Sequence, residues 1–564
     1  MILYAALIFG EEKTGAIIIT AAEIKKMNVR KIADLLNQVP GIKASDTSVS
    51  IHGSYKVKVI FDGRPINDPT SSHGLIRFDL VFLETVEKIE IYRGKGALKY
   101  GDDASGGVIL ITTGKIETLH GNIKAYWGNY NTSSYQGNCR TKNGNLGIGI
   151  SAGYDYTDGY QDNDDREKKQ AGVKFEYDWD GRLKFGLSAD YLKNERGLKG
   201  RTEYPTPNSR KNNEMFSYGL VTNVNGIAME TFYNHAKTEN RDPDRGVYNT
   251  ITVKEIGEDI STSFESKDLG TITCGAAFRW GEASSLSFAT QNEHSVSLFA
   301  ADTLSFASQP VTLSFGLRGS LYSEFDNTLN PETKILYKQD KWSLSFNYSR
   351  TNNIPSFYQR YNKTGTREPN PDLEMEVADN FTLSFFAQIS NDLSWGISLF
   401  NNRIMDRITY VLSDNGIGKY ENFGEVTYKG LDILFNIKFI ENFSLKTTYT
   451  YLKAIDEDTG FSLSAKPRHR IYADFFYSPM EDFSIILNIK YESEQYTRSG
   501  NKFPEPEHTI GNIRVEYSPV KMNGCLGQME FFGEVKNIGD KTYRRGDGWL
   551  APPRTLIGGL TYRF

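Results

Sequence analysis

The sequence predicts a mainly β protein: a 22-stranded antiparallel transmembrane β-barrel with a small N-terminal α+β domain folded inside its lumen. Three observations lead to this prediction. Residues 90–113 run from a short alternating strand through a glycine-rich loop into an apolar strand. The roughly 450 residues that follow contain repeated amphipathic strands, which is typical of membrane barrels. No apolar run approaches the ~18 residues that a membrane-spanning helix needs.

Bulk composition agrees with a barrel. The mean hydropathy of the 564-residue chain is −0.47, although it contains 33 tyrosines and 33 phenylalanines. Barrel strands are apolar on one face only and therefore average out as mildly polar. The formal net charge of −5 gives no basic surface for nucleic acid. Cys139, Cys274 and Cys525 lie far apart and form neither a metal motif nor a disulfide framework.

The N-terminal unit is predicted to span residues 14–115. An N-terminal extension, residues 1–13, precedes it and has the apolar character of a secretory signal remnant. Thr20 and Glu23 have the spacing of a capping box at a helix N-terminus. Apolar residues within 32–39 then recur on one face of a short helix, which Pro40 and Gly41 end. Short strands are expected at 49–53, 57–61, 86–92 and 107–112.

Residues 120–564 are predicted to form the barrel. In 342–348 and again in 483–491, apolar residues alternate with small or polar ones, as expected of strands between lipid and a wet lumen. At about ten residues per spanning strand, the region has room for about 22 strands. A soluble sandwich also alternates, but an open sheet of this size would expose its edges. Aromatic residues expected at the membrane interfaces are Tyr126, Trp127, Tyr177, Trp179, Trp342 and Trp395.

Several short motifs occur in a defined order along nearly the whole chain. Those of the N-terminal unit are AIIITAAEI, QVPGI at 38–42, SIHG at 50–53, VIFDGRPIN at 59–67, VEKIEIYRG at 86–94, and YG and GGVILI at 100–111. Those of the barrel are NPDLE at 370–374, YEN at 420–422, KGLD at 429–432, KPRH at 466–469 and VKNIGDKTY at 535–543. In order and spacing, these motifs resemble those of TonB-dependent outer-membrane receptors of the cobalamin and siderophore type, whose N-terminal domain is called the plug.

The resemblance implies a protein of the outer membrane of a Gram-negative bacterium. Its implied partners are TonB, within the TonB–ExbB–ExbD complex on the periplasmic side, a metal-chelate ligand and outer-membrane lipid. A monomer with no enzymatic activity, no required cofactor and no nucleic-acid partner is expected. The chain departs from the family pattern in having His52 where an arginine is usual, Lys95 and Leu110 at two further positions, and no TonB box in residues 1–16.

The resemblance also implies that ligand contacts come from the apical loops of the plug and from extracellular loops. By position, the apices are two polar loops with an aromatic ring, an amide and hydroxyls suited to a bulky polar ligand. The alternative is that both are ordinary plug turns. The candidate ligand-binding residues are Ser54, Tyr55, Lys56, Asn67, Asp68, Ser71, Ser72 and His73.

A barrel of this size has a lumen wide enough to leak, so the folded domain inside it is also a barrier. Four plug charges, Asp62, Arg64, Glu90 and Arg93, are candidates to meet charges on the lumen wall and hold the plug in place. The alternative for each of them is an ordinary solvated charge.

The loop after the strand at 146–157 is acidic and contains Asp158, Asp162, Asp164 and Asp165. Carboxylates at this density are a candidate Ca²⁺ site, since calcium prefers hard oxygen ligands. The loop resembles, in position only, the calcium-binding loops of cobalamin transporters in this family. A solvated loop is the alternative interpretation.

The sequence therefore predicts an energised importer of a scarce metal chelate. A barrel this short for the family favours cobalamin slightly over a ferric siderophore. Haem receptors of this family typically carry a histidine in the region that corresponds to residues 354–373. This segment contains no histidine here, so the resemblance argues against haem as the ligand. The main alternative is a ligand-binding receptor or adhesin without energised transport. A passive channel would lack the N-terminal domain. An outer-membrane enzyme would need a catalytic constellation that the sequence does not show.

Overall fold

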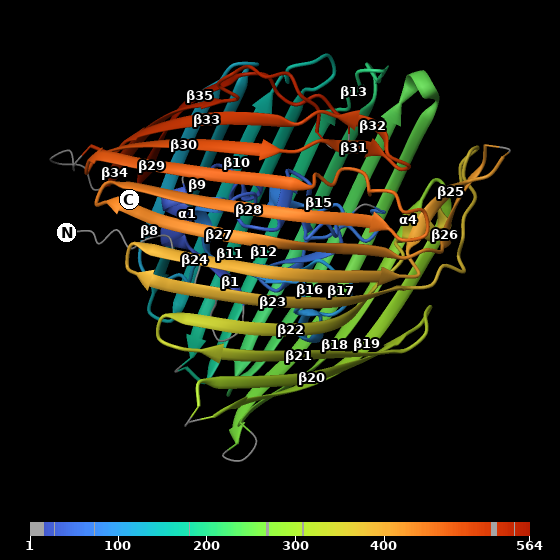
Figure 1. Ribbon diagram of the computed structural model, residues 1–564, viewed down its shortest axis with the longest axis horizontal. Helices are drawn as coiled ribbons and strands as arrows, with labels where there is room; N and C mark the ends of the chain where they lie inside the picture. Colours follow the sequence, from blue (N-terminus) through green and yellow to red (C-terminus); the bar gives the residue numbers. More distant parts are fainter. Residues whose placement is uncertain are drawn as a thin grey trace.

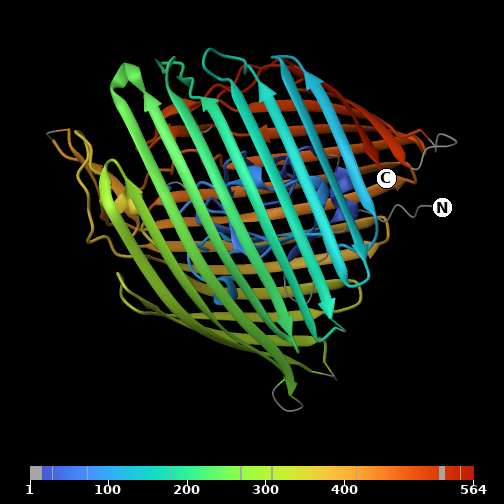
Figure 2. The same ribbon diagram turned by 180° about the vertical axis from the view of Figure 1, so that it is seen from behind.

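The computed structural model describes residues 16–27, 29–72, 74–179, 181–266, 270–306, 309–414, 416–519, 527–545 and 548–564. These residues form a closed barrel with a compact domain, the plug, inside it (Figure 1). Seen from behind, the plug again lies within the ring of wall strands (Figure 2). The predicted N-terminal extension, residues 1–13, lies outside the described residues.

The barrel is one antiparallel sheet of 22 strands, as the alternation predicted. It closes where β35 pairs with β8, with Ile557 opposite Gly128. Closure leaves no unpaired strand edge, which is the condition for a sheet to span a membrane. The strands are β8 (His120–Gly128), β9 (Thr132–Asn143), β10 (Leu146–Thr157), β11 (Arg166–Trp179), β12 (Leu183–Gly197), β15 (Arg210–Val224), β16 (Ile227–Asp242), β17 (Val247–Ser266), β18 (Gly270–Ser285), β19 (Phe288–Ser305), β20 (Val311–Tyr322), β21 (Thr328–Lys338), β22 (Trp342–Asn353), β23 (Glu376–Ser390), β24 (Leu393–Met405), β27 (Val426–Ile440), β28 (Phe443–Asp456), β29 (His469–Met480), β30 (Phe483–Glu492), β33 (His508–Tyr517), β34 (Gln528–Lys536) and β35 (Thr555–Arg563).

The period-two pattern decides which side chains face lipid. In β22, Leu344 is 40% exposed on the outside, whereas its neighbour Ser345 is 1% exposed on the lumen side.

The same rule corrects one sequence-based expectation. Tyr126 does not belong to the interfacial aromatic belt: its ring is buried in the lumen against Phe532, because the adjacent Trp127 occupies the outward position.

The plug is built on a five-stranded sheet in the order β1-β6-β7-β4-β5, with β4 and β7 parallel. Its apolar side chains, including Ile19, Val59 and Ile89, are fully buried in one core. The four predicted strands are confirmed with small shifts of their ends. The plug elements are β1 (Ile17–Thr20), α1 (Ala21–Met27), α2 (Ile32–Leu36), β2 (Ile42–Ser45), β3 (Ser48–Ile51), β4 (Val57–Phe61), β5 (Arg64–Pro65), η1 (Phe78–Leu80), η2 (Leu83–Thr85), β6 (Val86–Arg93), α3 (Ala97–Tyr100) and β7 (Gly107–Thr113).

Both predicted helices are present, but α2 ends at Leu36, before Pro40 and Gly41. The carboxylate of Glu23 accepts hydrogen bonds from the backbone N–H and hydroxyl of Thr20 at 2.6 and 2.8 Å, which caps α1. Helix α2 then buries Ile32, Leu35 and Leu36 in the plug core. Among the described residues, no helix is both long enough and apolar enough to cross a membrane.

The two ends of the barrel differ in their connections. At one end several neighbouring strands are joined by two-residue turns, such as 144–145 and 225–226. The other end, called the long-loop end below, holds the longer loops. In outer-membrane barrels the short turns are periplasmic and the longer loops extracellular. The remaining elements all lie in loops of the long-loop end: β13 (Gly200–Arg201), β14 (Tyr204–Pro205), η3 (Pro243–Arg245), α4 (Phe357–Tyr361), β25 (Ile408–Leu412), β26 (Gly418–Asn422), β31 (Gln495–Arg498) and β32 (Lys502–Glu505).

Candidate functional site

A polar cavity of about 190 Å³, called the apical cavity below, lies between the plug and the wall near the long-loop end. The plug contributes three loops to it, within 52–56, 67–75 and 100–105. The wall contributes residues of β16 to β20 and the start of the loop that follows β22. The cavity is therefore bounded by both domains, and a ligand in it would contact both.

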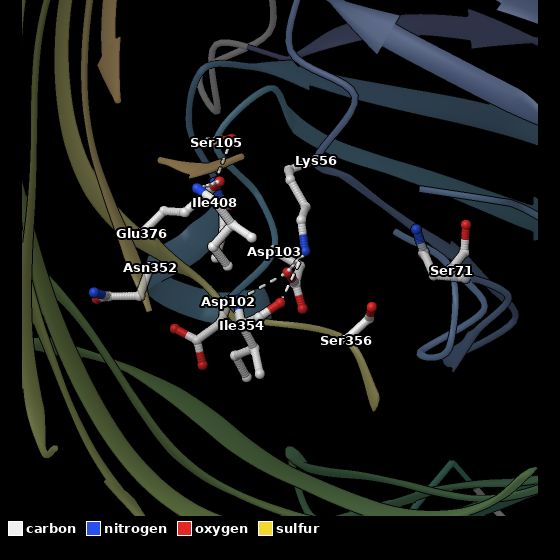
Figure 3. Close-up of polar contacts among 12 residues, drawn as sticks. Lys56, Ser71, Asp102, Asp103, Ser105, Asn352, Ile354, Ser356, Glu376 and Ile408 are labelled. Carbon is white, nitrogen blue, oxygen red and sulfur yellow. Dashed lines mark hydrogen bonds and ion pairs between the residues drawn. The ribbon is translucent and has the colours of Figure 1, made fainter. Parts of the chain in front are cut away.

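The first plug loop positions its residues in different ways. Ser54 is buried, and its hydroxyl lies 2.9 Å from that of Ser105 in the third loop, so it joins two loops. Lys56 lines the cavity and donates to Asp103 at 2.8 Å and to the backbone oxygen of Ile354 at 2.9 Å (Figure 3). Burial alone would lower the pKa of Lys56, but Asp103 outweighs it and raises this pKa above its ordinary value. Lys56 is thus a charged bridge from plug to wall.

Tyr55 also lines the apical cavity and is covered from the outside. The ammonium of Lys466, in the loop 457–468, lies 3.6 Å from the centre of its ring. The same ammonium donates a hydrogen bond to the backbone oxygen of Gly53. An extracellular loop therefore rests directly on the first plug apex.

Asn67 and Asp68 line the cavity but are also held by the plug itself. The amide of Asn67 donates to the backbone oxygen of Val57 at 2.8 Å and accepts from the N–H of Val59 at 2.8 Å. Burial would raise the pKa of Asp68, but Arg77 at 2.9 Å, with help from Thr70, lowers it. Both side chains fix the shape of the second loop.

The remaining predicted residues of the second loop differ in whether they line the cavity. Ser71 lines the cavity, and its hydroxyl accepts from the N–H of Leu75 at 3.0 Å. Ser72 is not part of this lining and instead lies near Tyr420 of β26. His73 lies outside the described residues. Ligand contact by any of these residues stays a prediction.

The third plug loop, residues 100–105, was missed by the sequence analysis although it lines the same cavity. Asp103 accepts from the backbone N–H of Ile354 at 3.1 Å in addition to Lys56. Asp102 accepts from the hydroxyl of Tyr322 at 2.8 Å, and burial raises its pKa. The signal was available in the sequence: two aspartates follow Tyr100-Gly101 and precede a predicted strand.

The third loop is also anchored to the base of the loop that follows β22. Ser105 accepts from the amide of Asn353 at 3.1 Å. That amide donates in turn to Glu376 at 2.8 Å, and Glu376 accepts from the N–H of Ile408 at 2.9 Å (Figure 3). A continuous network therefore links a plug apex to β23 and to the extracellular hairpin β25–β26.

The lining of the apical cavity mixes aromatic and charged groups. Tyr55, Tyr100, Phe232 and Phe357 supply flat apolar surface. Six carboxylates face four cations, so the lining has no excess of positive charge. The charged residues are Lys56, Lys58, Arg279 and Arg318, with Asp68, Asp102, Asp103, Glu255, Glu293 and Glu324.

Three of the four plug charges proposed to meet the wall do so: Arg64 and Arg93 closely, and Asp62 at longer range. Arg64 is 1% exposed and forms an ion pair with Asp190 of β12 at 2.7 Å. It also donates to the backbone oxygen of Ser217 on β15 at 3.1 Å. Gly219 makes room for this side chain, because a Cβ there would lie 2.8 Å from Cδ of Arg64.

The second contact is Arg93, whose guanidinium lies 2.8 Å from Asp432 of β27. The same carboxylate oxygen accepts from Nε2 of His52 at 2.8 Å, and the other oxygen accepts from Thr450 at 2.9 Å. The imidazole of His52 is fully buried and stacks on Phe400 at 3.8 Å. Burial lowers the pKa of His52, and the negative charge of Asp432 opposes this shift without cancelling it. The sequence had marked His52 only as a departure from the family pattern.

Asp62 and Glu90 act mainly within the plug. Asp62 accepts from the backbone N–H and hydroxyl of Thr113 at 2.8 and 2.6 Å, with Lys174 of the wall more distant at 3.7 Å. Glu90 pairs with Lys88 of the same strand at 2.8 Å rather than with the wall.

In the acidic loop, two of the four aspartates form ion pairs with basic side chains. Lys199 lies 3.0 Å from Asp164, and Arg210 lies 2.6 Å from Asp165. Asp158 accepts from the hydroxyl of Tyr156 at 2.7 Å, and no contact of Asp162 links it to the other carboxylates. Over the described residues, no three histidine, cysteine, aspartate or glutamate side chains gather as a metal site. The Ca²⁺ site stays a prediction.

Two family models match the chain. The model described as the TonB-dependent receptor plug domain matches residues 11–108, and the model described as the TonB-dependent receptor-like β-barrel matches residues 116–538. Together they cover both bodies of the fold.

Solved structures share this fold at low identity. The siderophore receptor PirA from Acinetobacter baumannii is 17% identical, with a TM-score of 0.81 over 99% of this chain and 100% of that one. A mutant of the ferric enterobactin receptor PfeA from Pseudomonas aeruginosa is 17% identical, with a TM-score of 0.84 over 99% and 100%. The copper transporter OprC is 14% identical, with a TM-score of 0.83 over 97% and 98%. From the family models and the closed, plugged barrel, we conclude that the chain belongs to the TonB-dependent receptors, which are outer-membrane proteins of Gram-negative bacteria.

Proposed function

We propose that this receptor imports a scarce metal chelate into the periplasm, with energy supplied through TonB by the TonB–ExbB–ExbD complex. The observation that carries the proposal is the apical cavity, which three plug loops and the barrel wall bound jointly. A ligand in this position contacts both the receptor surface and the barrier that must move. A binding-only receptor has no need of such a shared cavity.

The chemistry of the apical cavity favours a bulky organic chelate over a bare metal ion. Among the residues that the structure describes, its lining contains no cysteine or methionine and one histidine, His294. Soft sulfur and imidazole ligands are the ones that select copper. Aromatic rings and scattered polar groups instead suit a large polar ligand. Within this class the short barrel favours cobalamin slightly over a ferric siderophore.

Uptake assays in cells test the proposal. The receptor is expressed in a Gram-negative host that lacks its own receptors, and uptake of cobalamin and of iron-55 chelates is measured with and without a functional tonB gene. We expect uptake of at least one chelate in the tonB-positive host alone and surface binding in both hosts. Binding without uptake in either host would instead support the alternative, a receptor or adhesin without energised transport.

A further inference from the structure

A second, larger cavity lies on the other side of the plug. This side cavity has a volume of about 780 Å³. Its wall is formed by strands β8 to β12 and β29 to β35, whereas the apical cavity lies against β16 to β20. It extends from the loops at 159–165 and 543–555 down to α2 of the plug. The mechanism proposed above makes no use of it.

The charge of the side cavity is opposite in sign to that of the apical cavity. Ten cations and seven carboxylates line it, and two of the cations, Lys490 and Arg514, pair with Glu492 and Glu516 behind the lining. A small surplus of positive charge therefore remains inside a confined, low-dielectric lumen. The cations are Arg30, Lys31, Arg166, Lys168, Arg196, Lys199, Lys490, Arg514, Lys536 and Arg545, and the carboxylates are Asp34, Asp46, Asp79, Asp155, Asp164, Asp165 and Glu534.

The positive charge is concentrated in a row across three wall strands. Arg166 of β11 lies directly opposite Arg196 of β12, which lies directly opposite Lys211 of β15. Directly opposite like charges destabilise a sheet. A row of this kind is stabilised when anionic groups lie against it.

The plug supplies ion-pairing carboxylates to one end of the row, and at the other end its Asp68 acts on Lys211 at longer range. Arg166 pairs with Asp79 at 2.6 Å and with Asp46 at 3.4 Å. Among the described residues, by contrast, the Nε of Arg196 is buried with no hydrogen-bond partner. Arg196 lines the side cavity. A buried guanidinium N–H without an acceptor is costly, and an anion in the cavity would satisfy it.

We propose that the side cavity binds an anionic group, a carboxylate or a phosphate, and that Arg196 is the residue that recognises it. The planar guanidinium presents paired N–H donors that match the oxygens of either group, and the neighbouring cations add a favourable field. As part of an import route the site rests on the proposed function, because the anion would then belong to the transported chelate. As an anion site it stands on the wall residues alone.

Calorimetric titration of the full-length protein in detergent tests the site. The probes are ferric citrate, citrate without metal, inorganic phosphate, and a ferric trihydroxamate that carries no carboxylate or phosphate. The variants are Arg196→Gln, Arg196→Lys and, as matched control, Lys193→Gln, which removes a cation from the outer face of the same strand. Heat-modifiable migration in gels checks that each variant forms the barrel.

We expect at least one anionic probe to bind the unmodified protein and to lose about tenfold in affinity in Arg196→Gln, as for loss of a charge-assisted hydrogen bond. Arg196→Lys should lose less, and Lys193→Gln should bind as the unmodified protein does. The inference is overturned if no anionic probe binds, if Arg196→Gln binds as tightly, or if the trihydroxamate loses affinity equally. Binding of citrate or phosphate tests the anion site without any transported chelate. The anion site can therefore be confirmed or overturned separately from the proposed transport function.

Discussion

Nε2 of His52 in the plug lies 2.8 Å from the carboxylate of Asp432 on the barrel wall, and Arg93 contacts the same oxygen at 2.8 Å. Two separate plug segments, one after β3 and one at the end of β6, therefore converge on a single wall residue. Asp432 is 2% exposed, so the contact is shielded from solvent. Two buried wall carboxylates, Asp432 on β27 and Asp190 on β12, each hold an arginine of the plug.

Replacement of Asp432 by asparagine should loosen the plug. The change leaves Arg93 as a poorly compensated buried charge, and breaking a buried pair costs about 3–5 kcal/mol. We expect faster hydrogen exchange in the plug segments around His52 and Arg93 and a higher conductance in planar bilayers. Asp178→Asn, at an exposed wall position, is the control and should change neither. Unchanged exchange in Asp432→Asn would show that His52 and Arg93 do not hold the plug.

The ion pair between Arg64 and Asp190 should behave as a coupled unit. Arg64→Met and Asp190→Asn each leave the partner's charge buried and unpaired, whereas the double variant removes both charges. We expect the double variant to be less destabilised than the sum of the single variants, by about 0.5–3 kcal/mol. Hydrogen exchange of β4, the strand that pairs with β5, measures the effect. Strict additivity would contradict a direct interaction.

Release of the contact between Lys466 and Tyr55 should free the loop 457–468. Lys466→Met removes the cation over the ring, an interaction of about 1–2 kcal/mol when partly desolvated. Hydrogen exchange of this loop should then increase. Tyr55→Ala removes the ring but leaves the hydrogen bond from Lys466 to Gly53, so it should increase exchange less than Lys466→Met, whereas Tyr55→Phe keeps the aromatic face and should leave the loop unchanged. Equal effects of the two Tyr55 variants would mean that the hydroxyl, not the ring, holds the loop.

Lys58 should titrate close to neutrality. Burial, with Arg279 nearby, lowers its pKa from 10.5 to about 8. Competitive acylation followed by peptide mass spectrometry should give a midpoint near this value, and Arg279→Gln should raise it. Because the folded-state pKa lies below the unfolded one, the unfolded chain binds more protons between these values. Plug stability should therefore rise with pH from about 8 to 10.5, and Lys58→Met should flatten this rise.

Calcium should have little effect on the acidic loop at residues 158–165. Asp164 and Asp165 already pair with Lys199 and Arg210, and Ca²⁺ would have to displace both cations. We expect the thermal unfolding temperature to change by less than about 2 °C on addition of millimolar calcium, since a ligand stabilises only in proportion to its affinity. A large calcium-dependent increase that is lost in Asp164→Asn would instead establish the predicted metal site.

The sequence determined the architecture of this protein because the controlling signals are local. Alternation in segments such as 342–348 fixes which face of each strand meets lipid, and the Thr20–Glu23 cap starts a helix without help from distant residues. Arg64 and Arg93 were predicted wall contacts because a plug in a wide lumen needs charged anchors. Local sequence signals could not predict which wall residue each of these arginines contacts.

Only the tertiary structure decided the pairings in the lumen. His52 and Asp432 are 380 positions apart, and their meeting depends on the register of every strand pair around the barrel. Glu90 shows the converse, since its partner is a neighbour on its own strand. The row formed by Arg166, Arg196 and Lys211 likewise exists only through cross-strand register. A period-two pattern specifies a face, but shear and closure, which are properties of the whole sheet, specify the neighbours on that face.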